Sequence, residues 1–226
     1  MSNTSHSHQA TEGGSPQSEQ AARFLDWLST VTAASPEKIN GNSGLSLIEL
    51  AELACAYAER SFERAGGAER LQSVDCRRGC DYCCHLPVES CRAEASRALE
   101  YAREKSSEVE FGELKRRIRE AAAAYPLPPG RPPAENPRCP FLKDSACLVY
   151  PARPLACRGW NSRDRAACRS AYELGVQRAK VPVDTRIRSV FCNASEALLR
   201  GLTVSGRDGP AHLVPALAAL ILLEPG

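Results

Sequence analysis

The sequence is poor in aromatic residues, in long hydrophobic runs and in charge of one sign. Phe, Trp and Tyr make up 6% of its 226 residues. The longest apolar run, residues 211–223, is too short to cross a bilayer and contains His212 and Pro215. The 29 Lys and Arg nearly balance the 27 Asp and Glu, which leaves a net charge of +2. These absences argue against a membrane protein and against a strongly basic protein that binds nucleic acid.

The N-terminus lacks the basic and apolar regions of a secretory signal, so we expect a cytoplasmic protein. Residues 1–17 are Ser, Thr, His, Gly and Gln without apolar periodicity, which predicts a disordered tail. Residues 18–226 are long enough to bury one core and are predicted to form a single helical domain, with a metal-binding core over residues 74–170. Four histidines, two of them in the tail, leave few candidates for general-base chemistry.

Helical periodicity dominates the chain, and no segment shows a convincing strand pattern. The proline-rich stretch 125–140 predicts an extended connector, and residues 40–44 predict a break. The predicted fold is all-α, an irregular helical domain with a cysteine-rich loop region. Its helices are expected over residues 18–31, 46–65, 87–105, 107–125, 163–178, 184–202 and 211–223.

Cysteine, by contrast, is abundant. The chain has eleven, an odd number that cannot all pair within one chain. In a protein that is not exported, clustered thiols bind metal or act in catalysis more often than they form disulfides. Four fall in a C-x3-C-x2-C-C spacing beside His85: Cys76, Cys80, Cys83 and Cys84. A C-x2-C step lets two sulfurs reach one metal ion, and Gly79 allows the tight turn that this needs.

Two other interpretations of this segment stay open. The same four positions fit a helical stripe, on which cysteine would be a small buried hydrophobe, and a disulfide framework is the third alternative. Arg77, Arg78 and Asp81 lie in the segment and no long aliphatic side chain does, which favours metal ligation over packing. Cys55, on the apolar face of the helix predicted over residues 46–65, is expected to be a buried thiol.

A second group of cysteines follows the connector. Cys139, Cys147 and Cys157 lie among prolines and a Lys-Asp-Ser turn, which predicts an ordered loop, and Cys168 is an eighth candidate ligand. Thiolates bind both zinc and iron–sulfur clusters, so the ligand type does not separate these cofactors. Seven motif cysteines exceed one four-ligand zinc site, and the side chains of the adjacent Cys83 and Cys84 diverge. One of that pair serves a second metal, bridges two metals, or packs.

Several bound thiolates would leave excess negative charge, and arginines lie beside them in sequence. Arg153 and Arg158 are expected to offset this charge or to donate hydrogen bonds to sulfur, and Tyr150 to pack over the site. A surface role is about as plausible for Arg77 and Arg78, and Arg138 is a further candidate. His85 is expected beside the ligands or exposed rather than as a nitrogen ligand.

The two cysteine segments together resemble the YkgJ-type cysteine-cluster family of zinc- or iron-chelating proteins. The first family motif corresponds to Cys76–Cys84, and the second, C-P-F-L followed by C-x2-Y-x2-R-P-x2-C-R, to Cys139–Arg158. The resemblance covers residues 74–170 and implies metal binding without an assigned reaction. Flagellin lysine methylases carry a similar cluster and are associated with an iron–sulfur centre, so that cofactor is carried over as an alternative, and methyl transfer is not.

We therefore expect a metal-binding protein that holds zinc or iron through its cysteine cluster. The alternatives are an iron–sulfur enzyme for electron or group transfer, and an interaction module whose metal only stabilises the fold. The expected partner is a metal ion, with neither membrane nor nucleic acid, and the sequence predicts no particular protein partner. The eight candidate metal ligands are Cys76, Cys80, Cys83, Cys84, Cys139, Cys147, Cys157 and Cys168.

Overall fold

The computed structural model describes residues 45–77, 79–128, 130–175 and 180–223, with four isolated positions in residues 22–30. The predicted tail, most of the helix predicted over residues 18–31, the break at 40–44 and Arg78 lie outside the described residues. The described chain is mostly helical, which confirms the predicted fold class.

The first long helix, α2 (Leu47–Arg64), lies where the sequence predicts it. Ser46 begins it with a capping box, in which the Ser46 hydroxyl accepts the Glu49 N–H and the Glu49 carboxylate accepts the Ser46 N–H. Gly66 follows the helix with a φ of 77°, a left-handed conformation that glycine adopts without strain. The short helix α3 (Gly67–Gln72) comes next.

Helix α4 (Arg92–Lys105) begins later than predicted. The sequence places its first turn at Pro87, but the chain is extended there and forms strand β1 (Glu89–Ser90). β1 pairs antiparallel with β4 (Ala211–His212), and the N–H of Leu213 donates to the carbonyl of Val88 at 2.9 Å. Because the backbone groups of residues 88–90 bond to β4 and Leu213, they are not available for an earlier first turn of α4.

The sequence shows no convincing strand pattern, yet short strands occur in the described part of the chain. Besides β1 and β4, strands β2 (Leu142–Lys143) and β3 (Ala146–Cys147) form a hairpin. Its two-residue turn, Asp144 and Ser145, has φ values of 49° and 54°, as a type I′ turn requires. All four strands are two residues long, too short to show the alternation by which strands are recognised in a sequence.

The remaining elements follow the predictions closely. Ser107 begins α5 with a second capping box, and Asp184 caps the start of α8. The proline connector stays largely extended and contains one 3-10 turn, η3. The bounds of the remaining elements are η2 Tyr82–His85, α5 Glu108–Ala123, η3 Pro133–Glu135, η4 Tyr150–Ala152, α6 Leu155–Gly159, α7 Arg165–Leu174, α8 Thr185–Val204 and α9 Leu213–Leu222.

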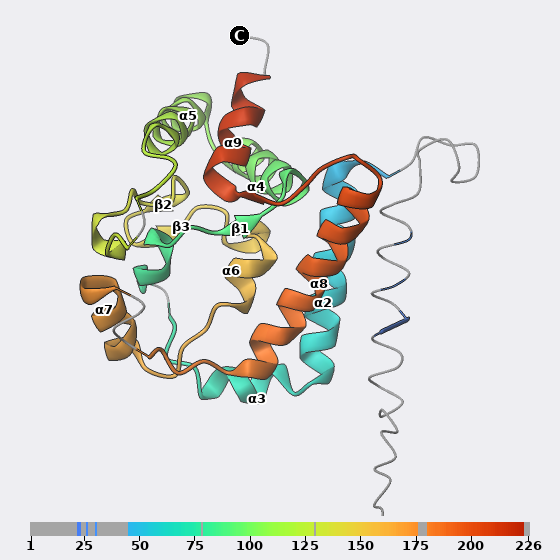
Figure 1. Cartoon of the computed structure of the whole chain (residues 1–226), viewed down its shortest axis with the longest axis vertical. Coiled ribbons are helices and arrows are strands. Elements are labelled where there is room, and N and C mark those ends of the chain that lie inside the picture. The colour runs from blue at the N-terminus through green and yellow to red at the C-terminus, as the bar shows by residue number, and fades with distance from the viewer. Residues whose placement is uncertain are drawn as a thin grey trace, which may run out of the picture.

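The helices form two groups joined by α4 (Figure 1). α2 and α8 lie side by side, while α5 and α9 pack with α4 at the other end of the molecule. The loops that carry most of the cysteines lie beside these groups, together with α6 and α7. α6 packs so closely on α8 that Gly159 has no room for a side chain. A Cβ added there would lie 3.1 Å from the Cβ of Phe191.

Two clusters of buried hydrophobic side chains form the core. The first joins α2, α6 and α8, and the second joins α5, α9 and residues 141–152. α4 contributes to both, with Ala93 in the first cluster and Ala98 in the second. Cys55 is buried in the first cluster, 3% exposed, which confirms its predicted role as a packed thiol.

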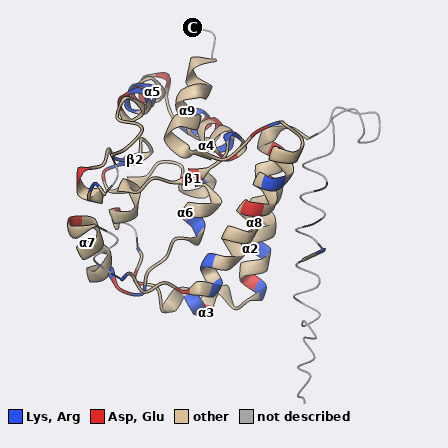
Figure 2. Ribbon diagram, viewed as in Figure 1, with Lys and Arg blue, Asp and Glu red and all other residues tan. Residues whose placement is uncertain are grey.

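Charged side chains of both signs are interspersed on the outer helix faces (Figure 2), and α9 carries none. Arg116 forms ion pairs with Glu113 and Glu120 on the exposed face of α5. Arg117 is different, because it is half-buried and donates to the carbonyl of Leu142. Within the described ranges, no helix is long and apolar enough to span a bilayer.

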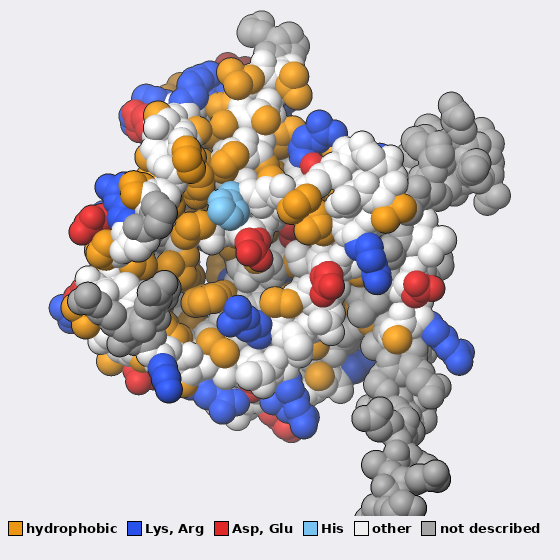
Figure 3. Space-filling view, viewed as in Figure 1, with side chains coloured by type: hydrophobic (Ala, Val, Ile, Leu, Met, Phe, Trp, Pro, Cys, Tyr) orange, Lys and Arg blue, Asp and Glu red, His pale blue; other side chains and the backbone are white. Residues whose placement is uncertain are grey.

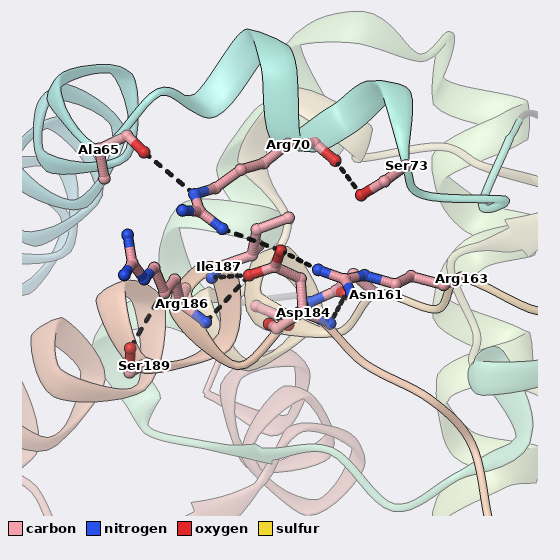
Figure 4. A network of polar contacts seen from close by, with 10 residues as sticks. Ala65, Arg70, Ser73, Asn161, Arg163, Asp184, Arg186, Ile187 and Ser189 are labelled. Atoms are coloured by element: carbon pink, nitrogen blue, oxygen red, sulfur yellow. Dashed lines mark hydrogen bonds and ion pairs between the residues drawn. The ribbon is translucent and has the colours of Figure 1, made fainter.

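The start of α8 is held by a polar network around Asp184, which is 2% exposed (Figure 4). Its carboxylate accepts the N–H groups of Arg186 and Ile187 and pairs with Arg70 at 3.1 Å and Arg163 at 2.6 Å. The hydrogen bond from Ile187 is the main cause that lowers the pKa of Asp184 to about 2. The network therefore connects three parts of the chain, namely α3, the start of α8 and the segment that precedes α7.

Candidate metal centre

The two cysteine segments meet in the folded chain. The backbone N–H of Cys139, at the start of the second segment, donates to the carbonyl of Cys84 in the first at 2.8 Å. The hydroxyl of Ser145, in the β2–β3 turn, donates to the carboxylate of Asp81 at 3.1 Å. The proline connector, which the sequence predicts to be extended, therefore carries the chain back to the first segment.

A third segment joins them and brings Cys168 close. The N–H of Asp75 donates to the carbonyl of Ser162 at 2.8 Å, and the Asp75 carboxylate accepts the N–H of Arg165 at 3.0 Å. Arg165 begins α7, and Cys168 lies one turn further along that helix. The side chain of Ser162 also hydrogen-bonds to the Cys168 thiol.

Four thiols from the first and third segments form one group. Burial is the main cause that raises the pKa of Cys76, to about 11, and the negative charges of Cys80, Cys83 and Cys168 raise it further. Burial likewise raises the pKa of Cys168, with Cys80 and Cys83 adding to the shift. Each of these thiols acts on the pKa of another, which places the four cysteines in one region of the fold.

A second group of four thiols is built around the later segment. Burial raises the pKa of Cys139 to about 12, with Cys147 and Cys83 contributing. Burial also raises the pKa of Cys157, and its neighbouring thiols are Cys139, Cys83 and Cys147. Cys83 thus belongs to both groups.

The adjacent pair Cys83 and Cys84 lies where the two groups touch. A hydrogen bond with the Cys84 side chain is the largest cause that raises the pKa of Cys83. The Cys84 carbonyl meanwhile binds the N–H of Cys139. The one segment in which two cysteines are adjacent is therefore the point at which both groups of thiols meet.

The donor set fits a soft metal by its chemistry. Cysteine sulfur is the preferred ligand of zinc and of iron–sulfur clusters. The raised thiol pKa values mean that a metal would have to displace protons to bind. Within the described chain, no three Cys, His, Asp or Glu side chains are arranged so that they could hold a metal ion. The thiols are thus neighbours without forming a coordination shell.

Of the three residues predicted to support the site, Arg153 lies closest to the thiols. Its charge acts against the raised pKa values of Cys83, Cys147 and Cys157. The Arg153 guanidinium stacks over the ring of Tyr150, 3.9 Å from its centroid, and Tyr150 itself is largely exposed. Tyr150 therefore contacts the site through Arg153.

Arg158 supports the loop that carries Cys157. It forms an ion pair with Glu59 of α2 and donates to the carbonyls of Pro151 and Arg153. Its side chain is 8% exposed. Arg158 thus fixes the backbone on which Arg153 and Cys157 lie.

The other arginines predicted near the thiols have different partners. Arg77 is 66% exposed and pairs with Asp75, in keeping with a surface role, and Arg78 lies outside the described residues. The charge of Arg138 acts on His85. Arg165 is a basic residue near the thiols that was not predicted from the sequence. It hydrogen-bonds to the thiol of Cys80. The available signal was its position three residues before Cys168 in a predicted helix.

His85 lies beside the cluster and is buried. Burial is the main cause that lowers its pKa, its ring edge packs on Tyr172 with centroids 4.8 Å apart, and its Nδ1 has no hydrogen-bond partner in the described chain. A cavity of about 20 Å³, bordered by Cys83, Cys168 and Tyr172, has room for a single water. His85 therefore supports the wall of the site.

The fold and these contacts define a helical protein in which three chain segments assemble a thiol cluster. Residues 75–174 match the model of the CxxCxxCC family, described as a "putative zinc- or iron-chelating domain". This match, over less than half of the chain, agrees with the resemblance drawn from the two motifs. The match supports metal binding in general and includes all eight candidate ligands. The chain has no match among curated proteins or among solved structures.

Proposed function

We propose that the protein binds zinc or iron through the thiols that its three cysteine segments bring together. The observation that carries the proposal is the hydrogen bond from the N–H of Cys139 to the carbonyl of Cys84. It joins two motifs that are 55 residues apart in the chain, counted from Cys84 to Cys139. Isolated buried thiols would not require the two cysteine-rich loops to be held against each other.

We further propose that the eight thiols serve two centres of four ligands each. Cys83 and Cys84 lie where the two groups touch, so one of them would supply a ligand to each centre. The first centre would add Cys76, Cys80 and Cys168, and the second would add Cys139, Cys147 and Cys157. Four thiolates around a divalent ion leave a net negative charge, which Arg165 beside the first group and Arg153 beside the second would offset.

The same thiols suit two kinds of centre. Zinc bound by four cysteines would be colourless and redox-inert, and an iron–sulfur cluster would absorb near 400 nm. The half-buried position of most of these cysteines suits either centre. An absorption spectrum of anaerobically purified protein together with elemental analysis separates the two.

The decisive experiment compares cysteine variants by metal content. If each centre uses four thiols, the wild-type chain is expected to hold about two zinc equivalents, or about four to eight iron equivalents as two iron–sulfur clusters. Cys157→Ser and Cys80→Ser should each lose about half of the metal or more, because each removes a ligand from a different group. Cys55→Ser and Cys192→Ser are the matched controls, since Cys55 is packed in the core and Cys192 lies on α8.

Full metal occupancy in both Cys157→Ser and Cys80→Ser would refute the ligand assignment. Equal metal loss in the Cys192→Ser control would show instead that metal content follows general stability. Circular dichroism on each variant checks that the helices are still formed.

A further inference from the structure

A large cavity lies apart from the cysteine cluster. Its volume is about 710 Å³, within the range of pockets that hold small organic molecules. It is open to solvent on one side and is lined by β1, the start of α4, α6, α8 and β4. The face of the molecule drawn in Figure 3 is hollowed between these elements, with acidic side chains at the margin of the hollow.

The lining combines apolar walls with negative charge. Leu199, Ala156 and Ala211 contribute apolar surface, while Glu89, Glu94 and Glu196 contribute carboxylates. Among the described residues that line the cavity there is no lysine or arginine, and His212 is its single basic side chain. A negatively charged ligand would therefore meet three carboxylates without a compensating cation.

Glu94 is the buried carboxylate of this cavity and is rigidly held. Its Oε1 accepts the N–H of Leu155 at 2.7 Å, and its Oε2 accepts the hydroxyl of Ser90 at 3.2 Å and the thiol of Cys91 at 3.7 Å. A carboxylate has about four acceptor sites, so three donors leave room for one more. Burial raises the pKa of this carboxyl group, which is 3% exposed and has no cationic partner among its hydrogen bonds. A positive group beside it would favour its ionised form.

We propose that this cavity binds a small organic cation, a protonated amine carried on an apolar body. The apolar walls would take the body of the ligand, and the carboxylates at the margin and in the wall would take the ammonium group. The proposal does not rest on the metal function.

The cavity and the cysteine cluster are nevertheless separated by a single helix. Ala156 of α6 lines the cavity, and the next residue, Cys157, belongs to the thiol cluster. Binding must therefore be measured on protein of constant metal content, which elemental analysis of each sample ensures.

The test uses 2-phenylethylamine as the probe, with 2-phenylethanol and 3-phenylpropanoate as neutral and anionic counterparts of similar size. Ligand-observed NMR on the full chain is expected to show binding of the amine, weaker binding of the alcohol and no binding of the acid. Ser195→Trp fills the cavity from α8 and should abolish binding of the amine, because Ser195 lines it.

Two exposed carboxylates at the margin give a second, milder variant. Glu89→Gln with Glu196→Gln should weaken amine binding by about fivefold, in line with the strength of exposed charge pairs. Glu100→Gln is the matched control, an exposed position of α4 outside the cavity lining, and should leave affinity unchanged.

Equal affinity for the amine and the alcohol, or no amine binding at millimolar concentration, would overturn the proposal. Amine binding that survives Ser195→Trp would place the site elsewhere and overturn it equally. These outcomes leave the metal proposal untouched, since metal content is measured separately.

Discussion

Arg153 is the cationic side chain that faces the thiols of the later cysteine segment. It acts against the burial that raises the pKa of Cys147 and Cys157, so it favours their thiolate forms. We expect Arg153→Gln to weaken metal binding by about tenfold or more, the usual cost of losing a group that supports metal ligands. Competition with a chromophoric chelator measures this. Arg77→Gln, an exposed neighbour of Cys76, is the control, and an equal loss there would contradict the assignment.

At the scale of single residues, the sequence predicts ligand types better than side-chain directions. Arg153 and Cys168 could be named from their positions, and the structure places both beside other cysteines. Arg158, one residue from Cys157, was expected at the site but pairs with Glu59. Adjacent residues of a helix point in different directions, and the register of α6 depends on packing against α8 that no local pattern encodes.

At the scale of elements, the start of α8 depends on Asp184. The folded pKa of about 2 lies below its ordinary value of 3.8, so the stabilisation is full above about pH 5 and is lost as the pH falls toward 2. We expect Asp184→Asn to lower the free energy of unfolding by about 2 to 4 kcal/mol at neutral pH. Urea unfolding should show this difference shrinking between pH 5 and pH 3.

The matched control for that prediction is Asp144→Asn, which removes an exposed carboxylate from a turn where asparagine tolerates the positive φ. It should change stability little at any pH. A gap between wild type and Asp184→Asn that stays constant down to pH 3 would show that charge at Asp184 is not the source of its effect.

Elements with local start signals were predictable, and those set by distant pairing were not. Ser46 and Ser107 begin α2 and α5 with capping boxes that can be read from the sequence. The start of α4 was misplaced because β1 pairs with β4, about 120 residues away in the chain. The same pairing forms one wall of the proposed ligand cavity, so that site had no signal in the sequence.

At the scale of the whole molecule, we expect metal to order the loops more than the helices. Residues 76–85 contribute few buried hydrophobic side chains, whereas α2 and α8 pack through the first core cluster. Removing metal with a chelator should therefore speed amide hydrogen exchange most in residues 76–85 and 160–175, by about tenfold or more, and change α2 and α8 little. Exchange followed by mass spectrometry measures this, and uniform acceleration along the chain would contradict it.

The shared position of α4 has a consequence for how the chain comes apart. One face of this helix completes the packing of α2, α6 and α8, and another completes that of α5 and α9. If one set of helices unfolds together with α4, the other set loses the packing that α4 provides. Heat or denaturant should therefore unfold both sets of helices in one cooperative transition. Neither set, expressed without α4, should fold.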